Sequence, residues 1–394
     1  MGTLRWTTAG ESHGKALVAV LEGMPAGIEL DLEVVDRELL RRQGGYGRGG
    51  RMRIESDRVE VLAGLRAGRT LGSPLALAVK NRDATIEDLP VPKSPRPGHA
   101  DLTGCQRMAE ADPRAVLERA SARETAMRVA LGGAARQVLE TFGVRLVGHV
   151  VELGGLATAA DEDGLAARLR TGRASADEAV DVRSEGEFNS LDPGVEGGWR
   201  SAVDGAKDAG DTLGGVFEVV VTGLVPGLGG VADPRDRLTG RLAGALLSIP
   251  ALKGVEFGLG FEAARRRGSQ LHDAIVPAES EGGIGAFGAF ARASNRSGGL
   301  EGGMTTGAPL VLRAAMKPIS TLRKGLDTVA FGGGEPVRST YQRSDVCAVP
   351  AASVVGEAVV ALELCGALVE AFGGASMELL GANLHAWAER ARGL

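Results

Sequence analysis

The chain has few cysteines, few aromatic residues and no strong excess of charge of either sign. Its three cysteines are too few and too scattered for a disulfide framework or a zinc site, so we expect reduced thiols in a cytoplasmic protein and no metal centre. Aromatic residues make up 4% of the chain and the net charge is −5, which argues against a nucleic-acid-binding surface. The first eight residues lack the pattern of a signal peptide, and we predict no apolar run that approaches the ~20 residues needed to cross a bilayer.

Glycine, in contrast, is abundant. The 60 glycines among 394 residues are about double the usual share, and they are spread between apolar segments. Two GxGxxG matches, starting at Gly45 and Gly283, are expected by chance in such a chain, and neither is predicted to open a helix after a strand. The segment from Gly10 to Lys15 lacks the spacing of a P-loop. We therefore predict a folded chain with many turns and without either nucleotide-binding motif.

The hydrophobic pattern predicts a mixture of helices and strands without a regular βαβ alternation and without an obvious linker. The predicted helices cover about 32–42 with Asp31 as N-cap, one long segment over 114–142, 236–248, and the end of the chain from about 351. The predicted strands cover 58–63, 74–80, 144–153, 216–221 and 310–316. The polar segment 159–178 is predicted to be peripheral. A simple parallel doubly wound sheet is not expected.

Two of the five histidines lie in short polar loops that contain glycine. His13 follows Ser12 and precedes Gly14, and His99 follows Gly98 and precedes Asp101 by two residues. Glycine neighbours let a ligand come close to the backbone, and histidine can exchange a proton near neutral pH. These two loops are our first candidates for catalysis. Of the others, His149 and His385 are interpreted as structural, and the sequence leaves the role of His272 open.

Several arginines lie in or beside segments rich in glycine, proline or serine: Arg42, Arg48, Arg96, Arg123 and Arg343. If they converge, they would bind a multiply anionic ligand through charge-assisted hydrogen bonds, and the alternative is an ordinary solvated surface. The segment from Lys317 to Thr321 follows a predicted strand and suits binding at a turn. Asp345 precedes an apolar run, so it needs a buried partner or a chemical role, or else it caps a turn.

Taken together, these segments resemble the chorismate synthase family. The matching stretches run in the family's order over nearly the whole chain: 10–14, 41–48, 96–104, 118–126, 207–215, 253–258, 302–307, 317–321 and 343–351. Motifs this long and this numerous are highly specific. One difference is Ala120, where some members carry a second serine. The resemblance implies an α+β fold, in which residues 1–394 form a single β-α-β sandwich domain, assembled as a homotetramer.

The resemblance also implies a reaction. The enzyme would be a carbon–oxygen lyase of the shikimate pathway that converts 5-enolpyruvylshikimate 3-phosphate into chorismate and phosphate by a 1,4-anti elimination. The reaction would require reduced FMN without net redox change. The sequence does not say whether the chain reduces its own flavin with NADPH, and because no reductase segment is evident we expect an external flavin reductase.

By the same resemblance, His13 would protonate the leaving phosphate, His99 would stabilise charge on the flavin, and Asp345 would handle the proton at flavin N5. Ser12 and Ser121 would support them. The five arginines named above would hold the anions of substrate or cofactor. The residues that would contact the flavin are Ser121, Ala122, Arg123, Ala251, Gly302, Lys317, Pro318, Ile319, Ser320, Thr321 and Arg343.

Two other functions remain open. A phosphotransferase that acts on ATP would transfer phosphate without flavin, and a non-catalytic binder of anionic metabolites or nucleic acid would show salt-sensitive binding without turnover. The acidic pI of about 5.7 argues against the second alternative.

Overall fold

The computed structural model describes residues 4–50, 54–110, 112–342 and 344–394. Its helices are α1 (Leu32–Gln43), α2 (Asp101–Met108), α3 (Arg114–Ala120), α4 (Thr125–Thr141), α5 (Leu165–Arg170), α6 (Ala176–Glu185), α7 (Glu196–Asp208), α8 (Leu238–Leu247), α9 (Gly268–Leu271), α10 (Val349–Phe372) and α11 (Met377–Arg392). The longer strands are β1 (Arg5–Ala9), β2 (Ala16–Glu22), β3 (Glu60–Ala63), β6 (Leu75–Lys80), β7 (Arg145–Leu153), β9 (Gly215–Thr222), β10 (Leu252–Phe257) and β16 (Leu310–Met316). The shorter strands are β4 (Leu65–Arg66), β5 (Arg69–Thr70), β8 (Leu156–Ala157), β11 (Ile275–Pro277), β12 (Ile284–Phe287), β13 (Phe290–Arg292), β14 (Leu300–Glu301), β15 (Met304–Thr305), β17 (Asp327–Val329) and β18 (Pro336–Arg338).

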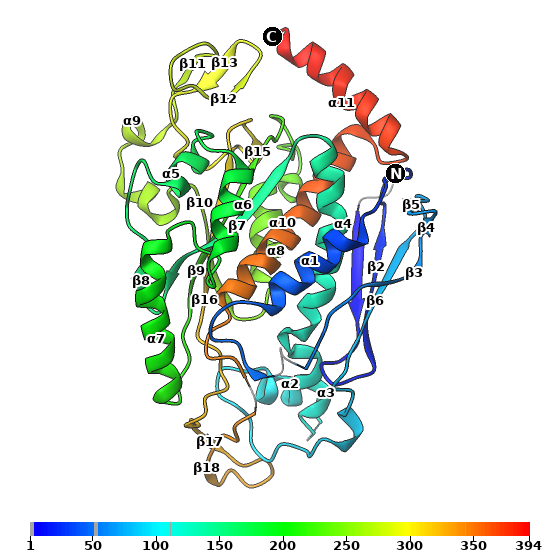
Figure 1. Cartoon of the computed structure of the whole chain (residues 1–394), viewed down its shortest axis with the longest axis vertical. Helices are drawn as coiled ribbons and strands as arrows, with labels where there is room; N and C mark the ends of the chain where they lie inside the picture. The colour runs from blue at the N-terminus through cyan, green and yellow to red at the C-terminus, as the bar shows by residue number, and fades with distance from the viewer. Residues whose placement is uncertain (1–3, 51–53, 111, 343) are drawn as a thin grey trace.

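Two antiparallel sheets lie on either side of a group of helices (Figure 1). The first sheet has the order β1-β2-β6-β3, and the second has the order β10-β16-β9-β7-β8. Helix α4 packs on β2 and β6, helix α10 packs on β7 and β9, and the two helices pack against each other. Helices and antiparallel sheets in one fold confirm the α+β prediction. That residues 1–394 form a single domain remains a prediction.

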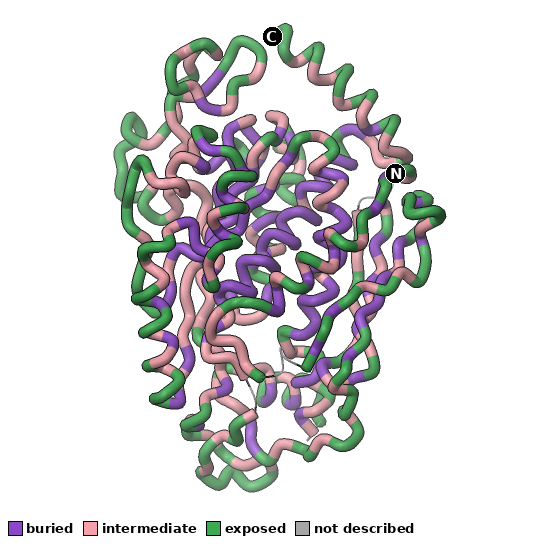
Figure 2. The backbone as a smooth tube through the Cα atoms, in the orientation of Figure 1, coloured by how far each residue is buried: buried purple, intermediate pink, exposed green. Residues whose placement is uncertain are grey.

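The core follows the two central helices, whose backbones are buried along most of their length (Figure 2). Helix α10 has a mean hydropathy of 1.9 and is long and apolar enough, by length and composition alone, to cross a membrane. Our prediction that no apolar run reaches that length was therefore wrong for this segment. Because 94% of its apolar window is buried within the fold, α10 serves here as a core helix.

The predicted helix over 114–142 is also wrong in one respect, because it is two helices with a break between them. Ser121 adopts an extended conformation (φ −66°, ψ 143°), and its side chain accepts a hydrogen bond from the backbone N–H of Arg123. Serine competes with the helix in this way because its hydroxyl can cap the next turn. Gly132 and Gly133 lie inside α4 without ending it.

The predicted helix from about 351 to the end of the chain is likewise two helices, because α10 ends before Gly373, which has φ +87°, and Ser376 caps the start of α11. The other predicted elements are present within a few residues, including Asp31, which caps α1 by accepting from the N–H of Glu33. Segment 159–178 is less peripheral than predicted. It contributes α5 and the start of α6, and its buried side chains Leu169, Ala174 and Ala176 form a second small apolar cluster with residues of β7, β9 and β16.

Candidate active site

His13 lies in the turn that joins β1 to β2. The turn needs glycine at position 10, because Gly10 has φ +105° and an added Cβ would lie 2.4 Å from the carbonyl oxygen of Ala16. The Nδ1 atom of His13 lies 2.9 Å from Oε2 of Glu118, and the backbone N–H of His13 donates to the same oxygen at 2.9 Å. Arg114 donates to the other carboxylate oxygen at 3.0 Å. A buried carboxylate on α3 therefore fixes this ring.

Glu118 is 1% exposed at its side chain. Burial raises the pKa of this carboxyl, but hydrogen bonds and charge from His13, together with the hydrogen bond from Arg114, outweigh it and hold the pKa below the usual range. The group is therefore ionised at neutral pH.

The two serines predicted to support catalysis do lie together. The hydroxyl of Ser121 donates to the hydroxyl oxygen of Ser12 at 3.1 Å, and the backbone N–H of Ser12 donates to the carbonyl of Glu118 at 3.0 Å. The break between α3 and α4 makes this contact possible, because it turns Ser121 out of the helix. The same break turns Arg123 inward, where it is 4% exposed.

Arg42 and Arg123 converge on Asp57. Arg123 donates to Asp57 at 2.6 Å and to the side-chain oxygen of Asn81 at 2.9 Å, and Asn81 in turn donates to the carbonyls of Glu11 and Gly14 in the His13 turn. Nη1 of Arg42 lies 3.8 Å from the same Asp57 carboxylate. Asn81 therefore connects the arginine pair to the His13 turn.

Two buried terminal nitrogens of this arginine pair make no hydrogen bond to any described residue. Among the residues that the structure describes, Nη1 of Arg42 and Nη2 of Arg123 are buried without a hydrogen-bond partner, although each has a carboxylate beyond hydrogen-bond distance, Asp57 at 3.8 Å and Glu55 at 3.6 Å respectively. Burial, with the neighbouring charges of Arg48 and Arg123, lowers the pKa of Arg42 although Asp57 opposes this. Buried donors that are unsatisfied and repel one another are costly unless an anion completes them.

Asp345 and Arg48 form an ion pair near Arg42. Nη1 of Arg48 donates to Oδ2 of Asp345 at 2.6 Å, and the backbone N–H of Gly49 donates to Oδ1 at 2.6 Å. The Asp345 side chain is 19% exposed. Both contacts agree with the prediction that this carboxylate is partly buried and needs a partner.

His99 has its own carboxylate and arginine. Its Nδ1 lies 2.6 Å from Oδ1 of Asp101, and Arg96 makes a bidentate contact with Asp101 through Nε at 2.8 Å and Nη2 at 3.0 Å. The remaining terminal nitrogen of Arg96 donates to Thr321 at 3.0 Å. The ammonium of Lys317 donates to the carbonyl of Gly98 at 3.1 Å. The His99 loop therefore lies against segment 317–321.

Segment 317–321 is joined to two further predicted positions. Ser344, beside Asp345, donates to the carbonyl of Thr321 at 2.8 Å. The N–H of Lys317 donates to the carbonyl of Ala251 at 3.0 Å, and Ala251 adopts φ +70°, which is rare for a residue other than glycine. Most of the predicted residues thus form two groups, one around His13 and one around His99.

The comparisons with known proteins agree on one family. The chorismate synthase family profile matches residues 4–369. The chorismate synthase of Rubrobacter xylanophilus is 50% identical over 396 residues, covering 98% of this chain and 96% of its own. The chorismate synthase of Geobacter metallireducens is 49% identical over 387 residues, covering 95% of each. The chain belongs to the chorismate synthase family.

A solved crystal structure of chorismate synthase also matches the fold, with a TM-score of 0.79 and 38% identity, covering 100% of this chain and 99% of its own. Family membership makes this chain a carbon–oxygen lyase that acts on phosphates, EC 4.2.3.5.

Two of the predicted residues do not join the others. Arg343 lies outside the residues that the structure describes. Gly302 lies in the turn between β14 and β15, and the neighbouring Gly303 accepts a hydrogen bond from Leu238 at the start of α8, whereas Ala251 follows the end of that helix. The ten residues of α8 separate these two positions by about 15 Å. Figure 1 places β15 far from α2, which begins two residues after His99.

Several residues of this chorismate synthase site were given no role from the sequence. Asp57 and Asn81, which bond to Arg123, were missed altogether. Glu118, Thr125 and Asp101 lie within the matching stretches but were not assigned, and Thr125 accepts from Nε of Arg42 at 2.9 Å. A signal did exist for Glu118, which lies four residues after Arg114 and three before Ser121 on a predicted helix. No local pattern marks Asp57 or Asn81.

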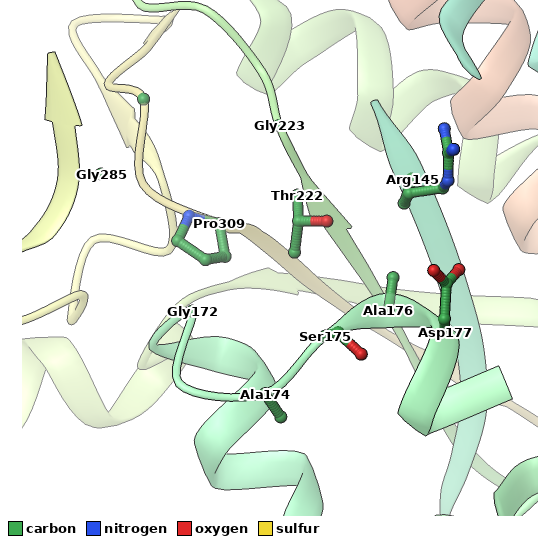
Figure 3. A pocket seen from close by; sticks show the side chains of 11 residues that line it. Arg145, Gly172, Ala174, Ser175, Ala176, Asp177, Thr222, Gly223, Gly285 and Pro309 are labelled. Atoms are coloured by element: carbon green, nitrogen blue, oxygen red, sulfur yellow. The ribbon is translucent and has the colours of Figure 1, made fainter. Parts of the chain in front are cut away.

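A cavity of about 360 Å³ lies elsewhere in the structure (Figure 3). It is lined by the start of α6 and the ends of β7 and β9, with Arg145, Asp177, Ser175 and Thr222 among its side chains. None of the predicted chorismate synthase residues lines it. We place the candidate active site at the histidines and arginines because the proton-transfer and anion-binding groups are there.

Proposed function

We propose that this chain eliminates phosphate from 5-enolpyruvylshikimate 3-phosphate to give chorismate. The supporting observation is the pair of buried guanidinium nitrogens on Arg42 and Arg123 that lack hydrogen-bond partners among the described residues. The substrate carries two carboxylates and a phosphate, and arginine donates to such groups through strong, often bidentate, hydrogen bonds. The reaction breaks a C–O bond to phosphate and a C–H bond on opposite faces of the ring.

The proposed role of His13 is to give a proton to the departing phosphate, since proton transfer from a positioned imidazole lowers the barrier to leaving. Ser12 and Ser121, whose hydroxyls contact each other, would hydrogen-bond the same group. Arg48, which lies beside Asp345, would bind a substrate anion. Arg96 would bind one through those of its N–H groups that do not already donate to Asp101 or Thr321. Asp345 would take part in moving the proton lost from carbon.

Reduced FMN, when bound, would supply electron density that assists phosphate departure and a basic N5 that accepts the proton, without net redox change. The residues present fit such a group. Segment 317–321 offers an ammonium, two hydroxyls and backbone groups beside His99, and burial with the charge of Lys253 lowers the pKa of Lys317, as expected where an anion has yet to bind. Ser121, Ala122, Arg123, Ala251, Arg343 and Gly302 complete the proposed contacts.

Gly302 bears on assembly. About 15 Å of α8 separates it from Ala251. We propose that Gly302 contacts the flavin of another copy of the chain, within the homotetramer that the family resemblance implies. We further propose that the layers of the fold are the family's β-α-β sandwich in one domain, and that the enzyme works in the cytoplasm in the shikimate pathway that leads to aromatic amino acids. An external flavin reductase would supply reduced FMN, and NADPH would be its electron donor.

The test is anaerobic incubation of the protein with dithionite-reduced FMN and 5-enolpyruvylshikimate 3-phosphate, followed by absorbance of chorismate. We expect turnover with reduced but not oxidised FMN, and we expect His13→Ala to bind FMN yet lose roughly 10²–10⁴-fold in kcat. No chorismate from the wild-type protein under these conditions would overturn the proposal, and ATP-dependent phosphate transfer would favour the phosphotransferase alternative.

A further inference from the structure

The two histidines of the site are held in the same way. Each has a carboxylate at Nδ1, and each carboxylate is backed by an arginine. Glu118 lies 2.9 Å from Nδ1 of His13 with Arg114 behind it, and Asp101 lies 2.6 Å from Nδ1 of His99 with Arg96 behind it. Both carboxylates are 1% exposed. The chain builds this arrangement twice from different elements, α3 in one case and the start of α2 in the other.

Among the described residues, every group that hydrogen-bonds to these carboxylates is a donor. Glu118 accepts from the backbone N–H and ring of His13 and from Arg114. Asp101 accepts from the backbone N–H, Nε and Nη2 of Arg96 and from the ring of His99. An ionised carboxylate only accepts, so Nδ1 of each histidine must carry the proton. Each neutral ring then has its lone pair on Nε2. At His13 this atom also lies 3.9 Å from Oδ2 of Asp83, too far for a hydrogen bond but close enough to favour a proton on Nε2 when the ring is charged.

At His99 two contacts compete for Nδ1. Nη2 of Arg96, which can only donate, lies 3.1 Å away and would suit the opposite tautomer, but the carboxylate oxygen of Asp101 is nearer at 2.6 Å and already accepts from the same Nη2, so we assign the Nδ1 proton to the Asp101 contact. Among the residues that the structure describes, no group bonds to Nε2 of His99. The pKa of Asp101 is lowered, because hydrogen bonds and charges of His99 and Arg96 outweigh the burial that raises it.

We propose that Glu118 and Asp101 are positioning residues that fix Nδ1–H of His13 and His99, so that Nε2 of each histidine is the atom that exchanges a proton or hydrogen-bonds with the ligands. Arg114 and Arg96 hold the carboxylates in turn. Arg114 also donates to the carbonyl of Pro90 at 2.8 Å and so joins the His13 group to the segment that leads to His99. The roles of His13 and His99 rest on the proposed function, whereas the tautomers do not.

The chain provides a matched control. Away from the site, Nε2 of His149 lies 3.1 Å from Glu218 between β7 and β9, and Arg170 donates to Glu218 at 2.7 Å. Histidine and carboxylate are each 1% exposed. Glu218→Gln therefore removes the same kind of charge from the same kind of group, without touching either candidate histidine.

The kinetic test is a double-mutant cycle. Glu118→Gln cannot satisfy all the donors around it, because one end of the amide is itself a donor, so His13 loses its fixed orientation. We expect kcat to fall about 10- to 100-fold, as for other groups that orient a functional histidine, with a much smaller change in KM. In a His13→Ala background the same substitution should have less than about a twofold effect, because it acts through His13. Asp101→Asn is tested in the same way with His99→Ala.

Glu218→Gln should lower stability but leave kcat, counted per FMN-binding site, unchanged in both backgrounds. If Glu118→Gln lowers activity as much in the His13→Ala protein as in wild type, its effect is general and the positioning role is wrong. Equal effects of Glu118→Gln and Glu218→Gln on kcat would overturn the proposal as well.

A spectroscopic test needs neither turnover nor a carboxylate variant. Magic-angle-spinning ¹⁵N NMR of histidine-labelled wild-type protein at alkaline pH should show both rings as the neutral Nδ1–H tautomer, with signals assigned by their loss in His13→Ala and His99→Ala. The Nε2–H tautomer at either ring would refute its positioning. If the tautomers are as expected but wild type makes no chorismate, the proposed function fails and the positioning stands.

Discussion

A close contact between the two central helices predicts that the same substitution, glycine to alanine, will have different effects at two adjacent positions of α4. Gly132 in α4 faces α10, and a Cβ added there would lie 2.5 Å from both Cα and Cβ of Ala358 and 2.7 Å from its carbonyl oxygen. These atoms belong to a buried helix and cannot rotate away. Gly132→Ala would therefore force the helices apart by roughly 1 Å, in a core packed as tightly as a crystal.

The magnitude follows from two opposing contributions. Overpacking a buried contact costs about 1–3 kcal/mol, and replacing a helical glycine by alanine returns about 1 kcal/mol of helix propensity. At the neighbouring Gly133, an added Cβ would lie 3.4 Å from Cα of Val35, which is close to an ordinary contact. Gly133→Ala should therefore keep the propensity gain alone. The two variants should differ in free energy of unfolding by about 1–3 kcal/mol, the overpacking contribution.

The assay is urea unfolding of the two variants and wild type, followed by far-UV circular dichroism, at equal protein concentration. We expect Gly132→Ala to unfold at lower urea than wild type and Gly133→Ala at equal or higher urea, with similar m-values. If the two variants were equally stable, or if Gly132→Ala were the more stable one, the helices would not be in contact at this position as described.

Two further predictions concern charge. Glu357→Gln should cost about 3–5 kcal/mol of stability, because the buried Glu357 neutralises Arg41, Arg183 and Arg136; burial raises its pKa but these charges lower it further. Since the folded pKa is the lower one, this contribution is complete above the unfolded pKa of about 4.3 and is lost as pH falls below it, which acid titration of wild type against the variant will measure. Arg42→Ala should weaken binding of 5-enolpyruvylshikimate 3-phosphate by about 1.5–3 kcal/mol in calorimetry, whereas the exposed Arg69→Ala should not, and equal losses would mean that the effect is only long-range charge.

The sequence predicted most elements of the fold because they depend on local signals. Asp31 is a side-chain cap for α1, and the apolar pattern of β16 needs no distant partner to be recognised. The break at Ser121 was missed because the apolar pattern continues through it, and the hydroxyl that stops the helix acts over only two residues. The sequence did not predict how fully α10 is buried, because its three glutamates interrupt the apolar run. In the structure Glu357 is buried and forms ion pairs with arginines from three other helices.

The site divides in the same way. The histidines and arginines could be chosen from their residue types and loop contexts, and the structure brings His13, Ser12, Ser121, Arg123 and Arg42 together. Their pairing with carboxylates could not be predicted, since Asp57 lies 66 residues from Arg123 and Glu118 lies 105 residues from His13, although Arg114 marks Glu118 locally. Charge pairing of this kind depends on the tertiary fold, which no local pattern encodes.

Asp345 shows how the geometry changes the experiment that the sequence suggests. From sequence, Asp345→Asn would separate a proton-transfer role from a turn cap, because asparagine caps turns well. In the structure one carboxylate oxygen accepts from Gly49 and the other from Arg48, so an asparagine must turn its N–H₂ toward one of these donors. Even a purely positioning role therefore predicts a change, namely a higher KM as Arg48 is released, with an unchanged isotope effect for substrate deuterated at the C–H bond that breaks. A role in proton transfer predicts instead a lower kcat and a larger isotope effect at nearly constant KM. If neither KM nor the isotope effect changes, Asp345 neither holds Arg48 in place for the substrate nor moves the proton.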